Sequence, residues 1–342
     1  MTDLEKLCSR VTEAADCAVI TDDVNRRYFT AMKSSAGTLV VFPEKAYFII
    51  DFRYIEKAKK TVTACEVILQ DKLYEQINSL IEKHGAKTVS VNADTCTLSE
   101  LIAYQQKLNA EVIADTKLAE IIREIRTIKS QEQIDKIIKA QRIAEKGFAH
   151  MLDFIKVGRT EKEIQLELDY YMLKNGAEAL SFDTIALSGS NTSLPHGVPS
   201  NKKVESGEFV LMDFGATYDG WHSDMTRTVC VGKPSDKMKS VYETVLTAQL
   251  TALDAVKAGM SGKALDKIAR DIITEAGYGD NFGHSLGHGV GVEIHESPYA
   301  SPSREDILPE NSIVTVEPGI YLEGKFGVRI EDFVVVTENG CI

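Results

Sequence analysis

The chain has 342 residues, more than one ordinary domain core holds, so two domains are expected. Its formal net charge of -12 argues against a phosphate-backbone partner and no Lys/Arg-rich stripe appears, so we expect no nucleic-acid partner. The start MTDLEKLCSR has no apolar signal-peptide core and no apolar run approaches the roughly 18 residues of a membrane span, so we expect no membrane association.

Glycine, proline and histidine are distributed unevenly along the chain. Residues 1–125 contain two glycines and one proline, whereas the remainder holds the other 21 glycines and seven prolines. Five of the seven histidines fall between His196 and His295. We therefore predict two domains, 1–125 and 126–342, with the chemistry in the second. The six cysteines have no CxxC or CxxH spacing, which favours reduced thiols and a cytoplasmic location.

The first domain reads as a mixture of strands and helices. Residues 18–52 are strand-like, as AVITD, then YFTAM (28–32), then TLVVFPEKAYFIID with a hairpin turn at Pro43-Glu44-Lys45. Helical runs follow at 53–60 and 73–84, then a short strand at 88–92 and a helix from about Ser99. The pattern predicts a small α/β domain.

The second domain opens with helices. A charged helical stretch at 118–129 leads into a capping box at Ser130, and a second capping box at Thr160 opens a helix that ends at Gly176. Further helices are predicted from Ser235 and over 263–276. The β-like segments are 184–188, 208–218, 221–231, 312–317 and 328–337. Because strands and helices do not alternate regularly, we predict an α+β domain of antiparallel strands covered by helices.

Two of the three aspartates in a predicted hairpin, VLMDFGATYDGWHSDMTRT at 210–228, are candidate metal ligands. If Asp219-Gly220 forms the two-residue turn, Asp213 lies diagonally across from Asp224 on the same face. Diagonal neighbours are about 7–8 Å apart between backbones, and two carboxylates at that spacing can converge on a metal pair. Exposed strand acids are the alternative, but Asp213 sits in an apolar run where an unpaired carboxylate is costly to bury.

Three more candidate ligands follow in the chain. His288 lies in a glycine-rich stretch, 284–296, which also contains His284 and His295. On strict strand alternation His288 and His295 face opposite sides, and spacing alone does not decide whether both reach one site. Glu317 ends a strand before Pro318-Gly319, and Glu331 lies in an apolar strand, where an ion pair with Arg329 is the alternative.

Together, Asp213, Asp224, His288, Glu317 and Glu331 supply four carboxylates and one imidazole. Such an oxygen-rich set favours hard or borderline divalent ions over a structural thiolate zinc site. We expect two divalent metal ions, Mn2+ first and Co2+, Fe2+ or Zn2+ as alternatives, because the crowded carboxylates would otherwise repel one another.

These residues resemble the pita-bread metallopeptidases, specifically the proline peptidases: aminopeptidase P and Xaa-Pro dipeptidase, or prolidase. The stretch 284–296 resembles the family's histidine signature, and DFG, TRT, VEPG and RIED resemble its other ligand motifs in the family's order. IREIRTIKSQEQIDKIIKA resembles its interdomain entry, and YFT through IDFRY its N-terminal domain, so the resemblance covers the whole chain. It implies a ribonuclease-H-like N-terminal domain without nuclease activity, a homodimer, and a peptide substrate with proline at the second position.

The resemblance also implies a role for each residue. Asp213 would bind one ion, Asp224 and Glu331 would bridge both, and His288 and Glu317 would bind the other. Glu317, His196 and His295 would be catalytic, with the two histidines contacting the substrate and the developing oxyanion. His284 would line the same pocket, and Arg329, also counted among the substrate-binding residues, would orient the carboxylates.

Several activities fit this resemblance. The main prediction is Xaa-Pro aminopeptidase, with Xaa-Pro dipeptidase as the alternative; which one depends on whether a basic group such as Arg304 reaches the substrate's C-terminal carboxylate. Creatinase-like enzymes lack the metal ligands, and methionine aminopeptidases have a Cys-His-Gly context where this chain has PHGVPS around His196. A non-enzymatic binding protein on this fold would have lost ligands, whereas all five are present.

Overall fold

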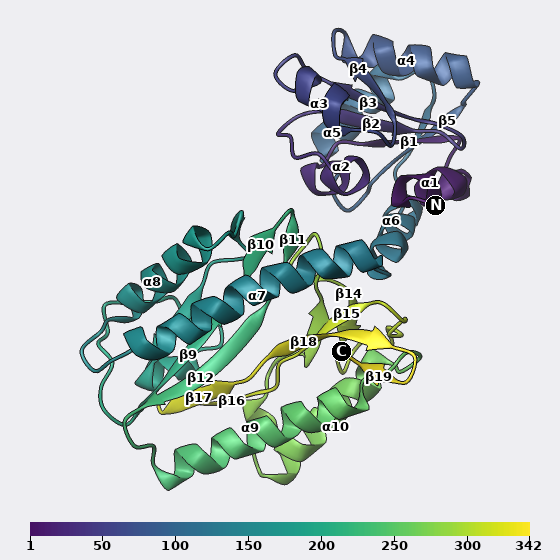
Figure 1. Ribbon diagram of the computed structural model, residues 1–342. Helices are drawn as coiled ribbons and strands as arrows, with labels where there is room; N and C mark the ends of the chain where they lie inside the picture. Colours follow the sequence, from purple (N-terminus) through teal and green to yellow (C-terminus); the bar gives the residue numbers. More distant parts are fainter. The chain divides into compact units, whose positions relative to one another are not determined.

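The computed structural model describes residues 1–342 (Figure 1). The chain forms two compact units, Met1–Arg126 and Thr127–Ile342. None of its helices combines the length and the apolar character needed to cross a membrane.

The first unit is built on a six-stranded mixed sheet with the order β4-β3-β2-β1-β5-β6. β1 pairs parallel with β5 and antiparallel with β2, and separate apolar clusters, one around Phe48 and one around Tyr47, form its core. The elements are α1 (Asp3–Arg10), β1 (Cys17–Ile20), α2 (Asp23–Thr30), β2 (Thr38–Val41), β3 (Ala46–Ile50), α3 (Ile55–Thr61), β4 (Glu66–Leu69), α4 (Leu73–His84), β5 (Thr88–Val91), α5 (Leu98–Lys107), β6 (Glu111–Ile113) and α6 (Lys117–Thr127).

The predicted strand at 28–32 is wrong, because these residues lie at the end of the helix α2 and in the turn after it. The Asp22 side chain caps this helix by accepting a hydrogen bond from the Asn25 backbone N–H. The helix ends at Thr30, and its C-cap residue, Ala31, has a left-handed backbone. A good N-cap and a buried helix face at Phe29 outweigh the β-propensity of a Tyr-Phe-Thr run.

The second unit contains four α-helices and a set of short sheets in which every strand pair is antiparallel. This confirms the α+β class. The elements are α7 (Gln131–Phe154), α8 (Glu161–Lys174), β7 (Ala179–Leu180), β8 (Ile185–Ser188), the 3-10 helix η2 (Gly189–Ser193), β9 (Glu208–Phe214), β10 (Ala216–Tyr218), β11 (Trp221–His222), β12 (Met225–Val231), α9 (Asp236–Ala255), α10 (Gly262–Glu275), β13 (Gly287–Gly289), β14 (Glu296–Ala300), β15 (Ile313–Val316), β16 (Gly319–Leu322), β17 (Phe326–Arg329), β18 (Asp332–Thr337) and β19 (Gly340–Cys341).

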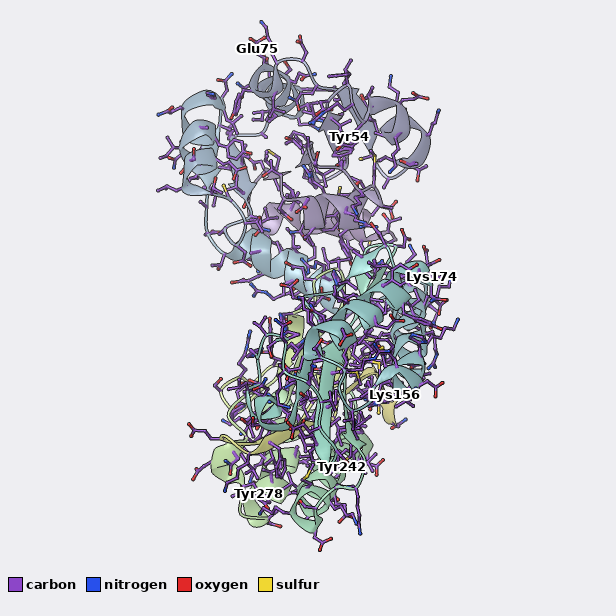
Figure 2. All side chains as sticks on the ribbon, turned by 90° about the vertical axis from the view of Figure 1, so that its left-hand side faces the viewer. Tyr54, Glu75, Lys156, Lys174, Tyr242 and Tyr278 are labelled. Atoms are coloured by element: carbon purple, nitrogen blue, oxygen red, sulfur yellow. The ribbon has the colours of Figure 1, made fainter.

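Two helix pairs cover the sheets of this unit from different sides (Figure 1). α7 and α8 pack on β8, β9 and β12 through an apolar cluster that includes Leu168 and Met212. α9 and α10 pack on β15 to β18 through a second cluster, which includes Val245 and Val314. Tyr242 of α9 and Tyr278, just after α10, lie at the same end of the unit (Figure 2). The strands between the two helix pairs carry the polar residues described below.

The predicted hairpin register is confirmed. Tyr218 pairs with Trp221, and further along Asp213 pairs with Thr226. Asp219 and Gly220 have φ angles of 49° and 83°, as a two-residue turn with two left-handed positions requires. The ladder is interrupted at Gly215, where a Cβ would lie 2.0 Å from the Ser223 carbonyl oxygen. Only glycine allows this close approach.

Candidate metal centre

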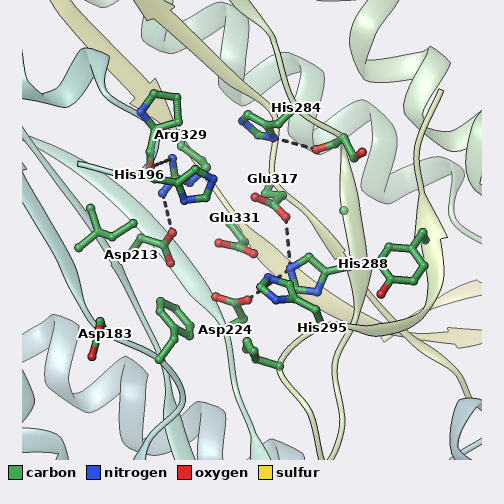
Figure 3. A pocket seen from close by; sticks show the side chains of 17 residues that line it. Asp183, His196, Asp213, Asp224, His284, His288, His295, Glu317, Arg329 and Glu331 are labelled. Atoms are coloured by element: carbon green, nitrogen blue, oxygen red, sulfur yellow. Dashed lines mark hydrogen bonds and ion pairs between the residues drawn. The ribbon is translucent and has the colours of Figure 1, made fainter. Parts of the chain in front are cut away.

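The five predicted ligands line one cavity of about 500 Å³ in the second unit (Figure 3). Four of them lie near the end of a strand or at a break between strands, and His288 is the middle residue of a short strand. Asp213 lies near the end of β9, Asp224 directly before β12, His288 in β13, Glu317 directly after β15, and Glu331 between β17 and β18. Residues more than one hundred positions apart in the sequence are thereby brought to one place.

Three of the five come close enough to share an ion. Ligand atoms of Asp224, His288 and Glu331 all lie within 4.8 Å of one another. The His288 Nε2 atom is 3.6 Å from Asp224 Oδ2 and 3.4 Å from Glu317 Oε1. Asp213 lies on the other side of Glu331 in Figure 3, beside Arg329.

The ring of His288 is oriented for ligation through Nε2. Its Nδ1 atom is 3.0 Å from the Gly289 carbonyl oxygen, which can only accept, so Nδ1 carries the proton. Burial, followed by the neighbouring His295, lowers the pKa of His288 to about 4, so the ring is neutral. The Nε2 lone pair therefore points at two carboxylates. That contact is unfavourable unless a cation lies between them, and a ligating histidine usually donates its other N–H in this way.

The carboxylates themselves are buried close together. Burial, followed by the neighbouring Asp213, raises the pKa of Asp224 well above its usual value, and burial followed by Asp224 does the same for Glu331. Burial raises the pKa of Glu317 to about 8, with Arg329 opposing the rise. Asp213 Oδ1 is buried without a hydrogen-bond partner. An unpartnered carboxylate oxygen beside three other acids fits a site built for cations.

Charge counting supports the same fit. The cluster of Asp213, Asp224, Glu317 and Glu331 faces one guanidinium, that of Arg329, so three negative charges remain when all four acids are ionised. Two divalent cations would more than neutralise them, whereas one would not. The donor set of four carboxylates and one neutral imidazole is also the type that Mn2+ and similar ions accept.

Glu331 lies at a point where the chain changes its strand partner, and the sequence does not predict this change. The predicted strand over 328–337 is interrupted, because β17 pairs with β16 while β18 pairs with β15. At the break, Glu331 bonds through its backbone to Thr226, whose hydroxyl donates to Glu331 Oε2 at 2.7 Å. Arg329 forms its ion pair with Asp213 at 2.5 Å, so the alternative of an Arg329–Glu331 pair is not what the structure shows.

Arg329 belongs to a buried polar chain that includes a residue absent from the sequence-based candidates, Tyr321. The Arg329 Nη1 atom donates to the Tyr321 hydroxyl at 2.8 Å, which lies 2.9 Å from His284 Nε2. His284 Nδ1 donates to the Ser285 carbonyl, and burial lowers its pKa to about 4, so its Nε2 accepts from Tyr321. Tyr321 lies two residues after Gly319, the last residue of the VEPG turn. Side chains two apart on a strand point to the same face, so this spacing could have identified Tyr321 as inward-facing.

The remaining predicted histidines also line this cavity. The rings of His288 and His295 are 4.4 Å apart between centroids. The chain reverses between β13 and β14, so strict alternation does not apply between these two residues. His196 follows η2 and lies beside Arg329 in Figure 3. One cavity therefore brings together all five candidate ligands and His196, His284, His295 and Arg329.

Apolar side chains complete the wall, and the sequence had not singled them out. They come from segments without a shared motif: Phe182, Ile185, Pro195, Ile294 and Tyr299. Such residues read as ordinary core positions until the fold brings them together. The cavity therefore combines a polar floor with an apolar wall, an arrangement common in small-molecule and peptide sites.

Comparisons with known proteins agree over the whole chain. The sequence profile of "Metallopeptidase family M24" matches residues 135–338, and that of "Creatinase/Prolidase N-terminal domain" matches residues 4–128. The Xaa-Pro dipeptidase of Pyrococcus furiosus is 40% identical over 341 residues, which is 99% of this chain and 96% of the relative.

Solved structures give the same result. The Xaa-Pro dipeptidase from Bacillus anthracis has a TM-score of 0.95 at 41% identity, covering 99% of this chain and 96% of that one. The X-Pro aminopeptidase from Thermotoga maritima MSB8 has a TM-score of 0.90 at 39% identity, covering 96% and 94%.

Proposed function

This chain belongs to metallopeptidase family M24 and has its pita-bread fold, and from that premise we propose that it hydrolyses Xaa-Pro dipeptides. The main prediction from the sequence is an aminopeptidase acting on longer peptides. Two of the three named relatives favour the alternative, because the Pyrococcus furiosus and Bacillus anthracis proteins are Xaa-Pro dipeptidases, whereas the Thermotoga maritima protein is an X-Pro aminopeptidase. The observation that carries the proposal is the convergence of five ligand-type side chains, two histidines and an apolar wall in one cavity.

Two divalent metal ions, Mn2+ first among them, would be held by Asp213, Asp224, His288, Glu317 and Glu331. When bound, they would supply an activated water as the nucleophile and polarise the scissile carbonyl. The His288 lone pair directed at the carboxylates and the unpartnered Asp213 Oδ1 support this assignment.

The chain's own residues would move the proton and stabilise charge. Glu317 is buried beside His288, where it can take the proton of the attacking water as the new C–O bond forms. It would return this proton to the imino nitrogen of proline as the C–N bond breaks. His196 and His295 line the same cavity and can donate hydrogen bonds to the oxyanion that develops on the carbonyl.

The rest of the cavity would select the substrate. Phe182 and Ile294 offer apolar surface for a pyrrolidine ring or an apolar side chain. Arg304 is the candidate for reading a free C-terminal carboxylate, since its guanidinium lies 4.1 Å over the ring of Tyr299, which lines the cavity. Its Nε atom is 3.4 Å from Asp306, so a substrate carboxylate would compete with that contact.

The test compares an Xaa-Pro dipeptide with the corresponding Xaa-Pro-Xaa tripeptide, with and without Mn2+. We expect metal-dependent turnover that strongly favours the dipeptide. The substitution Arg304→Gln should raise the KM for the dipeptide and leave the KM for the tripeptide unchanged. A strong preference for the tripeptide would support the aminopeptidase instead, and no metal-dependent turnover of either would refute the proposal.

The proposed assembly is a homodimer in the cytoplasm. All six cysteines are free thiols, as the reducing cytoplasm maintains them. Light scattering of the purified protein should give twice the chain mass of 37.7 kDa. A monomeric mass at micromolar concentration would contradict the dimer.

A further inference from the structure

A buried carboxylate outside the cavity has no place in the mechanism above. Glu161 is the first residue of α8, and its side chain is 0% exposed. An ionised carboxylate removed from water is costly unless donors surround it. No cation is paired with this one, so its stabilisation must come from neutral hydrogen-bond donors and from the N-terminal end of the helix dipole.

The donors to Glu161 come from both ends of one loop, residues 188–200. At one end Ser188 donates its backbone N–H at 2.7 Å and its hydroxyl at 3.1 Å. At the other end Ser200 donates its backbone N–H at 3.0 Å and its hydroxyl at 2.6 Å. Asn191 adds its side-chain amide at 3.0 Å from within the loop. One carboxylate thus closes the loop at its base.

The loop closed in this way carries His196. Its tip is docked by two contacts on β17, since Gly327 N–H donates to the Thr192 hydroxyl at 2.8 Å and Arg329 Nη1 donates to the Pro195 carbonyl at 3.4 Å. The His196 ring itself has no hydrogen bond or ion pair to another residue. Its position in the cavity therefore depends on the backbone of the loop.

We propose that Glu161 is a positioning residue for His196: its buried carboxylate fixes both ends of the 188–200 loop and so holds the imidazole in the active-site cavity. The proposal rests on the proposed function, in which His196 contacts the substrate. A small misplacement of such a group is costly, because about 1 Å can reduce the rate roughly a hundredfold.

The test is a double-mutant cycle on metal-loaded enzyme. Glu161→Gln keeps the shape of the side chain but replaces one accepting carboxylate oxygen with an NH2 group, which then faces the N–H and O–H donors of the loop. We expect kcat/KM for an Xaa-Pro dipeptide to fall about tenfold or more. The matched control is Glu163→Gln on the same helix: glutamine can still accept the capping hydrogen bond from the Thr160 N–H, and the side chain touches no loop residue, so kcat/KM should stay close to that of the wild type.

The cycle is completed in a His196→Ala background. If Glu161 acts through His196, Glu161→Gln adds little further loss there, because the imidazole it positions is already gone. Full additivity of the two losses would overturn the proposal, and so would wild-type kinetics in Glu161→Gln. If Glu161→Gln does not fold, Ser200→Ala removes a single donor to the carboxylate and should show the same non-additivity with a smaller loss.

Hydrogen exchange separates this proposal from the proposed function. The backbone N–H groups of Ser188 and Ser200 both donate to Glu161, so exchange across 188–200 should quicken in Glu161→Gln but not in Glu163→Gln. This readout needs no activity. Unchanged exchange would refute the loop closure, whereas faster exchange in a protein that hydrolyses no Xaa-Pro substrate would refute only the function.

Discussion

A buried ion pair links the start of the second unit to the strand beside His295, and breaking it should destabilise the protein strongly. Lys129 Nζ lies 2.6 Å from Glu296 Oε1, with side-chain exposures of 0% and 7%. Removing one partner of such a pair leaves the other charge buried and typically costs about 3–5 kcal/mol. Lys129→Met is therefore expected to lower the free energy of unfolding of this unit by that amount.

The assay uses the single tryptophan of the chain. Trp221 is buried in the second unit, so its fluorescence reports the unfolding of that unit alone. With an m value of about 3 kcal/mol per M urea, the midpoint should fall by roughly 1–2 M. The matched control is Lys136→Met, which breaks a pair with Glu132 and Asp219 where the lysine is 24% exposed, and should cost about 1 kcal/mol or less.

Two results would refute this reasoning. The first is a midpoint for Lys129→Met no lower than that of the Lys136→Met control. The second is a double variant, Lys129→Met with Glu296→Gln, that is less stable than Lys129→Met, because removing both charges should relieve the cost of an unpaired one.

Substitutions at Glu331, Arg329 and Asp16 test three other contacts. Glu331→Gln should abolish both metal binding and hydrolysis, and full activity at limiting Mn2+ would contradict the proposal that Glu331 bridges two ions. Arg329→Met should weaken Mn2+ binding about tenfold to a hundredfold in a titration, since it removes an orienting contact; unchanged affinity would count against it. The N–H groups of Lys87 and Thr88 hold the pKa of Asp16 below its usual 3.8. Its stabilising effect is therefore complete at neutral pH and is lost as the pH falls through the folded pKa, so urea midpoints of wild type and Asp16→Asn should converge in acid.

Much of the site could be predicted because its residues conflict with their local context. Asp213 is an acid in an apolar strand, and the Asp219-Gly220 turn sets which residue lies across from it, as the register shows. Helix starts such as Ser130 and Thr160 were equally legible, since each is a capping box that the structure contains. The turn and the capping boxes each depend on a few residues that are close together in the sequence, and each such pattern predicts one local structure.

The rest depended on long-range contacts. The tyrosine-phenylalanine run at 28–30 has strand-like composition, yet an aspartate cap and a buried face make it helical. The break at Glu331 follows from two strands choosing different partners, which no local pattern records. Glu161 looked like one acid in a charged helix start, and only the return of the 188–200 loop shows that it is buried.

The central claim is that these side chains form one cage for a pair of cations. Equilibrium dialysis of metal-stripped protein against Mn2+, with the bound metal measured by mass spectrometry, tests it most directly. We expect about two ions per chain in the wild type. Two results would contradict the claim. One is a wild-type protein that binds no Mn2+, and the other is a variant with Asp224→Asn and Glu331→Gln that still binds two ions.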